Sequence, residues 1–277
     1  MARVAPSSYP LDLMQCLNCS HAPLSQSGND GKGDALSHQR IFCSNCGQTY
    51  AISASGAIDF LSDEGFVNHL TPAQIIAHNP FFAWSYERMW RGNALSLLTG
   101  TSFSDRRESD LLNSWVEDAT PILDLAAAAG YWSRMVLRRH PDVTLVALDN
   151  SAPLLAEAAQ QTRARWPHYS LVRASAERLP FGDRTFAAVL SGGSLNELPV
   201  SQTLSEVARV LKPGGTFISM HVRQVNDWGS MFQQMWRWGG LQFFSEADIR
   251  RQFDTVGLEV QRYLVFGAIV FVNAMRS

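Results

Sequence analysis

The fold is decided by residues 121–151, which read PILDLAAAAGYWSRMVLRRHPDVTLVALDNS. The stretch opens with an apolar run at 122–125, which is too short for a helix and predicts a buried parallel strand. Small residues and one glycine follow, and an amphipathic helix is expected over 131–140. A second apolar run, 143–148, ends in Asp149. The predicted order is therefore strand, tight turn, helix, strand and acid.

The turn and the acid of this stretch are typical of nucleotide binding. A turn of small residues at the start of a helix lets a ligand come close to the backbone. Asp149 lies 19 residues after Gly130, where an acid would hold the two hydroxyls of a ribose. We therefore expect an α/β protein with a doubly wound sheet, and we expect its ligand at the C-terminal ends of the first, second and fourth strands.

Further motifs give residues 84–277 a resemblance to a known family. In chain order these motifs are DLAAAAG at 124–130, LDNS at 148–151, ASAERLPF at 174–181, FAAVLS at 186–191, SLNELP at 194–199 and EVARVLKPGG at 206–215. In this order and spacing they resemble the class I S-adenosylmethionine-dependent methyltransferases. The resemblance implies S-adenosylmethionine as the cofactor. It also implies a cofactor site built from Asp124, Ala126, Ala128, Gly130, Asp149, Asn150, Ser175, Ala176 and Ser191.

Three residues depart from the pattern of this family. Ala126 and Ala128 stand where glycines are usual, and alanine disfavours a positive φ, so we expect a less strained turn or a slightly displaced ligand. Ser175 stands where an acid usually accepts a hydrogen bond from the adenine amino group. A neutral hydroxyl is a weaker acceptor than a carboxylate, so we expect cofactor binding that is preserved but less tight.

Alternating strands and helices continue the domain, which is predicted to span residues 119–277. The expected helices are 151–166, 201–211 and one opened by Ser245 and Asp248, and the expected strands are 171–172, 186–191 and 216–222. Residues 258–265 and 268–274 are expected as an antiparallel pair at the edge. The predicted fold is a doubly wound, seven-stranded sheet that is mostly parallel with an antiparallel last strand.

Four cysteines near the N-terminus form two Cys-x-x-Cys pairs, Cys16 with Cys19 and Cys43 with Cys46. Two such pairs are typical of a zinc ribbon, in which each pair directs two thiolates at one metal ion. The alternative is two disulfides, which the first residues, lacking an apolar export signal, do not favour. Four thiolates leave no open position on zinc, so a structural metal is expected in a ribbon domain over residues 1–62.

Residues 63–118 are predicted as a mostly helical bridge. The central sequence HNPFFAWSYERMWR, at 78–91, resembles a narrower subfamily of cyanobacteria and plastids that joins a zinc ribbon to this methyltransferase domain. The spacing of Phe82, Tyr86, Met89 and Trp90 favours one face of a core helix. The alternative is that Tyr86 reaches the cofactor or caps the acceptor pocket. Charged residues at 106–110 are expected to form a solvent-exposed cluster.

The acceptor side of the site offers Asn196, Glu197 and His221 as candidate catalytic groups. Glu197 is the preferred general base, with a carboxylate of no chemical role as the alternative, and His221 is more typical of a pocket rim. Residues 222–244 are rich in aromatics and are expected to form a lid over the acceptor. Such a surface favours a flat, apolar acceptor, such as an aromatic alkaloid or a quinone-like ring, methylated on N, O or C. The alternative is a lid that packs on the bridge and leaves little room.

Composition limits the partners that we expect. The chain is 46% hydrophobic and 17% charged, with a formal net charge of −2, which suits a globular enzyme without general attraction to nucleic acid or to anionic membranes. No apolar run has the length of a membrane span. We expect a cytoplasmic enzyme, a monomer or weak homodimer, that acts on a small-molecule acceptor and binds no nucleic acid.

Two other functions remain as hypotheses from the sequence. An rRNA base methyltransferase is one, because some of those enzymes also carry an N-terminal zinc site, although a ribbon with few cations disfavours it. The other is a cofactor-binding protein that no longer transfers methyl groups, which Ala126, Ala128 and Ser175 keep possible.

Overall fold

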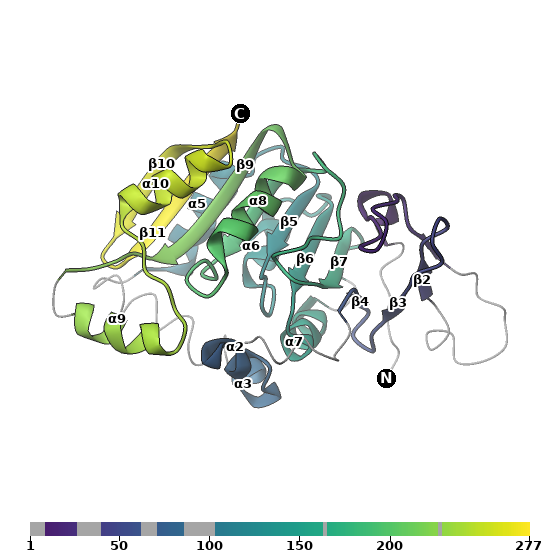
Figure 1. The fold of residues 1–277 in the computed structure, drawn as a ribbon, viewed down its shortest axis with the longest axis horizontal. Coiled ribbons are helices and arrows are strands. Elements are labelled where there is room, and N and C mark those ends of the chain that lie inside the picture. The colour runs from purple at the N-terminus through teal and green to yellow at the C-terminus, as the bar shows by residue number, and fades with distance from the viewer. Residues whose placement is uncertain (1–8, 27–39, 62–70, 86–102, 163–164, 227–228) are drawn as a thin grey trace.

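One β-sheet runs through the computed structural model, which describes residues 9–26, 40–61, 71–85, 103–162, 165–226 and 229–277. Within these residues the sheet has eleven strands in the order β1-β2-β3-β4-β7-β6-β5-β8-β9-β11-β10. Helices cover both of its faces over the larger, C-terminal part, as Figure 1 shows. The sheet is thus an α/β structure of the predicted class.

The centre of the sheet is parallel and buried. Its five strands are β5 (Ile122–Leu125), β6 (Leu145–Asp149), β7 (Tyr169–Arg173), β8 (Phe186–Gly192) and β9 (Leu211–Val222). Every residue of β5, β6 and β7 is buried, as expected for parallel strands covered on both faces. The two last strands, β10 (Leu258–Phe266) and β11 (Ile269–Arg276), form the predicted antiparallel pair beside β9.

Two layers of helices sandwich this sheet. On one face lie α5 (Asp105–Trp115), α6 (Tyr131–Arg139) and α7 (Ala152–Thr162), and on the other lie α8 (Val200–Val210) and α10 (Glu246–Thr255). Trp132 and Val136 of α6 pack on the first face, whereas Val207 of α8 and Phe253 of α10 pack on the second. The predicted capping box of Ser245 and Asp248 opens α10.

The N-terminal ribbon extends this sheet instead of standing apart from it. Its elements are the short helix η1 (Leu11–Leu13) and strands β1 (Ser25–Gln26), β2 (Arg40–Phe42), β3 (Thr49–Ile52) and β4 (Ile58–Asp59). Strand β4 pairs in parallel with β7, and residues of the ribbon share one hydrophobic core with the methyltransferase-like part. The sheet is therefore larger than the seven strands that we predicted, because the ribbon covers its open edge.

Three short helices lie along the carboxyl edge of the sheet, at the bottom of Figure 1. They are α2 (Pro72–Ala77), α3 (Pro80–Ser85) and α9 (Gly229–Trp238). A capping box of Thr71 and Gln74 opens α2. The turn after α9 touches the start of α2, since a Cβ on Gly240 would lie 2.8 Å from the side chain of Thr71. None of the described helices is long and apolar enough to cross a membrane.

Two local expectations about helices were wrong. Helix α8 begins after Pro199 and not after Ser201, whose hydroxyl contacts the neighbouring Gln202 instead of capping the helix. Glu108 is fully buried although we expected it in a solvent-exposed cluster, because its carboxylate accepts a hydrogen bond of 2.6 Å from the indole nitrogen of Trp132. A buried carboxylate needs such a partner.

Candidate functional site

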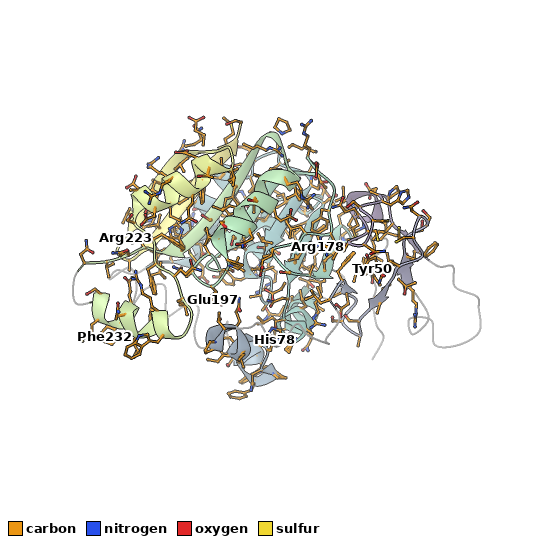
Figure 2. The ribbon with its side chains drawn as sticks, in the orientation of Figure 1. Tyr50, His78, Arg178, Glu197, Arg223 and Phe232 are labelled. Atoms are coloured by element: carbon orange, nitrogen blue, oxygen red, sulfur yellow. The ribbon has the colours of Figure 1, made fainter. Side chains whose placement is uncertain are left out.

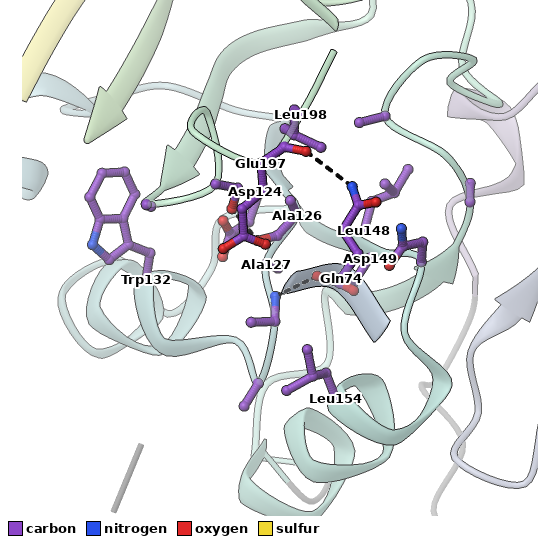
Figure 3. Close-up of a pocket in the computed structure, with 18 of the residues that line it drawn as sticks. Gln74, Asp124, Ala126, Ala127, Trp132, Leu148, Asp149, Leu154, Glu197 and Leu198 are labelled. Carbon is purple, nitrogen blue, oxygen red and sulfur yellow. Dashed lines mark hydrogen bonds between the residues drawn. The ribbon is translucent and has the colours of Figure 1, made fainter. Parts of the chain in front are cut away.

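A pocket opens at the carboxyl ends of β5, β6 and β8, where the sequence predicted the ligand (Figure 3). The residues that line it come from the ends of these strands and the loops after them, from the loop after β7, from the first turns of α6 and α7, and from α2 and α3. They are Gln74, Phe82, Asp124, Ala126, Ala127, Ala128, Ala129, Tyr131, Trp132, Leu148, Asp149, Asn150, Leu154, Ala174, Ser175, Ala176, Glu177, Gly192, Gly193, Ser194, Glu197 and Leu198.

The turn between β5 and α6 forms the floor of the pocket. Ala126 and Ala128 have φ angles of 53° and 50°, and Gly130, the N-cap of α6, has a φ of 78°. Our expectation of a less strained turn was wrong, because both alanines adopt the left-handed conformation that glycine adopts without a penalty. The turn therefore keeps the geometry of its glycine-rich counterpart, at the cost of strain in two alanines.

Asp149, at the end of β6, fixes this turn from the neighbouring strand. Its Oδ2 accepts a hydrogen bond of 2.8 Å from the backbone N–H of Ala128, and its Oδ1 accepts one of 2.8 Å from Ser151. The carboxylate is 7% exposed, and burial raises its pKa although these backbone donors oppose the rise. Each oxygen keeps a second lone pair, so the pair of oxygens fits a ligand diol while it holds the turn.

Two buried contacts support the opposite wall of the pocket. The Oδ2 of Asp124 accepts hydrogen bonds of 2.9 Å from the backbone N–H of Ser133 and of 2.6 Å from its hydroxyl. The indole of Trp132 lies so close to Gly192 that a Cβ there would be 2.8 Å from the ring. Only glycine fits at this last position of β8.

The loop after β7 closes the pocket on the side of Ser175. The Oγ of Ser175 accepts a hydrogen bond of 3.2 Å from the backbone N–H of Glu177, which fixes the hydroxyl at the start of a turn. Ser175 and Ala176 line the pocket together, as the resemblance implied. The hydroxyl keeps a lone pair that can accept a further hydrogen bond, and its role toward adenine stays a prediction.

Glu197 is a titratable group on the side of the pocket formed by the loop after β8, and it is labelled in Figure 3. Burial and the nearby charge of Asp149 raise the pKa of Glu197 to about 7. Within the described residues no side chain or backbone group donates a hydrogen bond to its carboxylate, while its backbone oxygen accepts one of 3.0 Å from the side chain of Gln74. A carboxylate with a pKa near neutrality can take up a proton at physiological pH.

Asn196 and His221, the other candidate catalytic residues, do not line the pocket. The side-chain nitrogen of Asn196 donates to the backbone oxygens of Val222 and Gln242, at 2.9 and 2.6 Å, and its oxygen accepts from the N–H of Val222 at 2.8 Å. Asn196 therefore clamps two loops. His221 is 1% exposed, and burial lowers its pKa to about 4, so it is a neutral core residue.

Two predicted cofactor residues among the described ones, Ser191 and Gly130, are also outside the pocket lining. Ser191 is fully buried in β8, and Gly130 supports the turn from below, where a Cβ would lie 2.8 Å from the hydroxyl of Tyr169. Tyr86 lies outside the described residues. The sequence missed Gln74, Gly193 and Leu198, among others; the glycine pair at 192–193, directly after a strand, was the signal that could have found this loop.

The aromatic segment predicted as a lid does not line the pocket within the described residues. Phe232 of α9 is 56% exposed and Trp238 is 82% exposed, and Figure 2 shows Phe232 on the outer side of the helix. Trp236 stacks on Phe243 with ring centroids 6.3 Å apart. The side-chain amide of Gln233 anchors the helix through the backbone of Arg223 and Val225. The lid therefore stays a prediction.

The four cysteines meet at one point in the ribbon. Their sulfur atoms all lie within 4.8 Å of one another, with 3.6 Å between Cys16 and Cys46 and between Cys19 and Cys43. Four thiolates at 2.3 Å from one zinc ion would be about 3.8 Å apart, so the donor set fits zinc. The amide of Asn45, which donates to Cys19, and the backbone N–H of Gln48 near Cys46 lower the pKa of these two thiols.

Comparison with known proteins places this pocket in a family. Residues 122–215 match the model of a methyltransferase domain. The chain is 26% identical, over 67% of its length and 54% of the relative, to an uncharacterized chloroplastic methyltransferase of Arabidopsis thaliana. It is 30% identical to a demethylmenaquinone methyltransferase of Lactiplantibacillus plantarum, over 56% of the chain and 64% of that relative. The chain thus spans less than two thirds of the length of either relative.

A solved structure shows the same fold. It is the geranyl diphosphate C-methyltransferase of Streptomyces coelicolor, determined with S-adenosyl-L-homocysteine, which superimposes with a TM-score of 0.55 at 16% identity over 62% of this chain and 76% of that one. The matched residues 122–215 include the turn after β5 and Asp149. Residues 122–215 therefore form a methyltransferase domain, and the fold is that of the class I S-adenosylmethionine-dependent methyltransferases.

Proposed function

We propose that this protein transfers a methyl group from S-adenosylmethionine to a small, apolar, aromatic acceptor of the quinone type. The observation that carries the proposal is a single pocket with two chemically different ends. One end has Asp149 and the strained turn, and the other has Glu197 beside apolar groups. The name of the Lactiplantibacillus relative, a demethylmenaquinone methyltransferase, supports a quinone-like ring.

The residues of the first end fit the cofactor. Asp149 would hold the ribose hydroxyls, Ser175 and Ala176 would lie against the adenine, and Asp124 would face the positively charged methionine part. The backbone of Ala126 and Ala128 would let the cofactor approach closely. When it is bound, S-adenosylmethionine supplies a methyl group on an electrophilic sulfonium.

The residues of the second end fit an acceptor that must lose a proton. An aromatic ring with a hydroxyl group becomes a stronger nucleophile when that proton leaves, and Glu197, which lines the pocket, would accept it. A bond then forms between the acceptor and the methyl carbon, while the bond from this carbon to sulfur breaks and the sulfur keeps the electron pair. Phe82 and Leu198 give this end apolar contacts that orient a flat ring.

Calorimetric titration with S-adenosylmethionine and a methyl-transfer assay test the proposal together. The assay follows a tritiated methyl group into a reduced naphthoquinone with a short alkyl chain, and the product is extracted into organic solvent. Binding followed by transfer supports the proposal. Protein that binds no S-adenosylmethionine would contradict the function, and binding without transfer to this probe would contradict the quinone-type acceptor.

We also propose that the four cysteines hold one structural zinc ion. The donor set is complete with four thiolates, so the ion has no open position for catalysis. Elemental analysis of freshly purified protein should find about one zinc per chain. Cys43→Ser should lower the zinc content and unfold the ribbon, whereas a protein that is purified without zinc and is fully folded would contradict the site.

A further inference from the structure

Arg173 joins the ribbon to the cofactor pocket. It is the last residue of β7, and in the register of the sheet it lies between Asp59 of β4 and Asp149 of β6. Its Nη1 lies 2.9 Å from Oδ2 of Asp59, and its Nε donates a hydrogen bond of 3.0 Å to the backbone oxygen of Asn150. Asn150 lines the pocket and follows the acid that fits the ribose.

This ion pair is shielded from water, unlike most others in the described chain. The side chains of Arg173 and Asp59 are 8% and 21% exposed, and the other carboxylate oxygen of Asp59 accepts a hydrogen bond of 2.9 Å from the backbone N–H of Leu61. Removing one charge of such a pair leaves the other without its counter-charge, which is costly in a buried place. The guanidinium of Arg173 would then lose the group that fixes its orientation toward Asn150.

A second set of contacts connects the ribbon to the loop after β7. The backbone N–H of Gln15 donates a hydrogen bond of 3.0 Å to the oxygen of Pro180, and Met14 forms an antiparallel bridge with Phe181. The guanidinium of Arg178 donates to the backbone oxygen of Leu17, and Figure 2 shows Arg178 on the side of the domain that faces the ribbon. Leu17 lies between the first two cysteines, so this loop rests directly on a metal-binding turn.

The cysteines and Asp59 are themselves connected inside the ribbon. The hydroxyl of Tyr50 lies 3.2 Å from the sulfur of Cys16 and accepts a hydrogen bond of 2.9 Å from the backbone N–H of Leu17. Tyr50 belongs to β3, the strand that pairs with β4 and places Ala51 opposite Asp59. Contacts therefore run without a gap from the cysteine site through two strands to Arg173 and the pocket.

We propose that the ribbon holds the adenine and ribose side of the pocket in its binding shape, with Arg173 and Asp59 as positioning residues. Metal binding in the ribbon and cofactor binding in the pocket then strengthen each other. This inference rests on the proposed function, because it takes the pocket as the site of S-adenosylmethionine and the cysteines as a zinc site. Coupling between two sites is reciprocal, so each ligand must stabilise the other by the same factor.

The experiment measures both directions of this coupling on the full chain. Calorimetric titration with S-adenosylhomocysteine is carried out on zinc-loaded wild-type protein and on the Asp59→Asn variant, which keeps the shape of the side chain. We expect Asp59→Asn to bind S-adenosylhomocysteine at least about fivefold more weakly, the usual lower limit for coupled sites, at an unchanged zinc content. In the wild type, saturating S-adenosylhomocysteine should lower the fraction of zinc that a coloured chelator removes at equilibrium, and Asp59→Asn should lose this protection.

Glu246→Gln is the matched control, since it removes the carboxylate of an exposed ion pair with Arg250 on α10, at 2.8 Å. It should bind S-adenosylhomocysteine as the wild type does. Equal affinity of Asp59→Asn and the wild type for S-adenosylhomocysteine would overturn the coupling and leave the proposed function intact. Zinc loss from the wild type that is the same with and without bound S-adenosylhomocysteine would do so too. Wild-type protein that is loaded with zinc and binds no S-adenosylhomocysteine would overturn the proposed function itself.

Discussion

The two ends of the pocket are built in opposite ways. The cofactor end lies between buried parallel strands, and its polar groups are fixed by hydrogen bonds such as those from Ala128 and Ser151 to Asp149. The proposed acceptor end is lined by Gln74 of α2 and Phe82 of α3, and these two helices together with α9, which does not line the pocket, carry eight of the ten large apolar side chains that are exposed among the described residues. The shape of the first end is therefore fixed by the central sheet. The shape of the second end depends on short helices, which are only marginally stable by themselves.

The largest effect is expected at the cofactor end. Asp149→Ala removes the acceptor for a ribose diol and also frees the backbone N–H of Ala128. We expect S-adenosylmethionine to bind more weakly by about 2–3 kcal/mol, which is a factor of about 30 to 150. Calorimetric titration measures this loss. An unchanged affinity would show that other residues hold the ribose and that Asp149 does not define a cofactor end.

Glu197→Gln separates the two ends by function. It should remove most of the turnover with the naphthoquinone probe, by roughly 100-fold as for other general bases, and leave cofactor affinity within about threefold. The wild-type rate should rise with pH through about 7, because the base form of Glu197 appears above its pKa. A variant that keeps both its rate and this pH profile would exclude Glu197 as the base.

The same variant has a consequence for stability. The pKa of Glu197 in the folded protein is raised from 4.5 to about 7, so stability is lost as the pH rises from 4.5, where the unfolded chain releases this proton, to about 7, and the full loss remains above 7. Glu197→Gln should therefore melt a few degrees higher than the wild type at pH 8 and equally at pH 4, where both side chains are neutral. Thermal unfolding at the two pH values measures this difference.

At the acceptor end, two tryptophans of α9 should behave differently. Trp236→Ala loses the stack on Phe243 and should lower the free energy of unfolding by about 1 kcal/mol, while Trp238→Ala, at an 82% exposed position, should change it by less than about 0.5 kcal/mol. Both should leave cofactor affinity unchanged. A raised Michaelis constant for the acceptor in either variant would support the predicted lid, and loss of cofactor affinity would show that the two ends are not independent.

The smallest effect is expected at the strained turn. Ala126→Gly and Ala128→Gly each remove the strain of an alanine with a positive φ, which stabilises the folded protein. Glycine also raises the conformational entropy of the unfolded chain, and this opposing effect is only slightly smaller. Each variant should be more stable by about 0.5 kcal/mol. Ala127→Gly is the matched control, since Ala127 is 8% exposed and has no positive φ, and it should be less stable. Equal losses in all three variants, seen by chemical denaturation, would contradict the strain.

The sequence predicted the local elements around the pocket better than the tertiary contacts that shape it. The apolar run of β5, the position of Asp149 and the two cysteine pairs depend on local patterns, which an unaligned sequence shows directly. The left-handed alanines were missed because their conformation is imposed by the hydrogen bond to Asp149, 21 residues along the chain from Ala128. A propensity of a single residue does not contain such a tertiary constraint.

Other misses have the same physical origin. Glu108 looked like part of a surface cluster, but Trp132 on a neighbouring helix buries it. Gln74 looked like an ordinary helix residue, yet it reaches the backbone of Glu197 across 123 residues. The size of the sheet was missed because nothing within β4, a strand of two residues, signals its partner β7.

The pairing of β4 with β7 also orders events during synthesis of the chain. Asp59 and Arg173 are 114 residues apart, so at ordinary elongation rates the ribbon leaves the ribosome on the order of ten seconds before the strand that it completes. During this interval the short strands have no large sheet to join, and a bound metal is the strongest constraint that the nascent segment can acquire by itself. When β7 emerges, the preformed ribbon can cover an edge that would otherwise pair with another chain. A shortage of zinc at the ribosome should therefore appear first as aggregation of newly made protein.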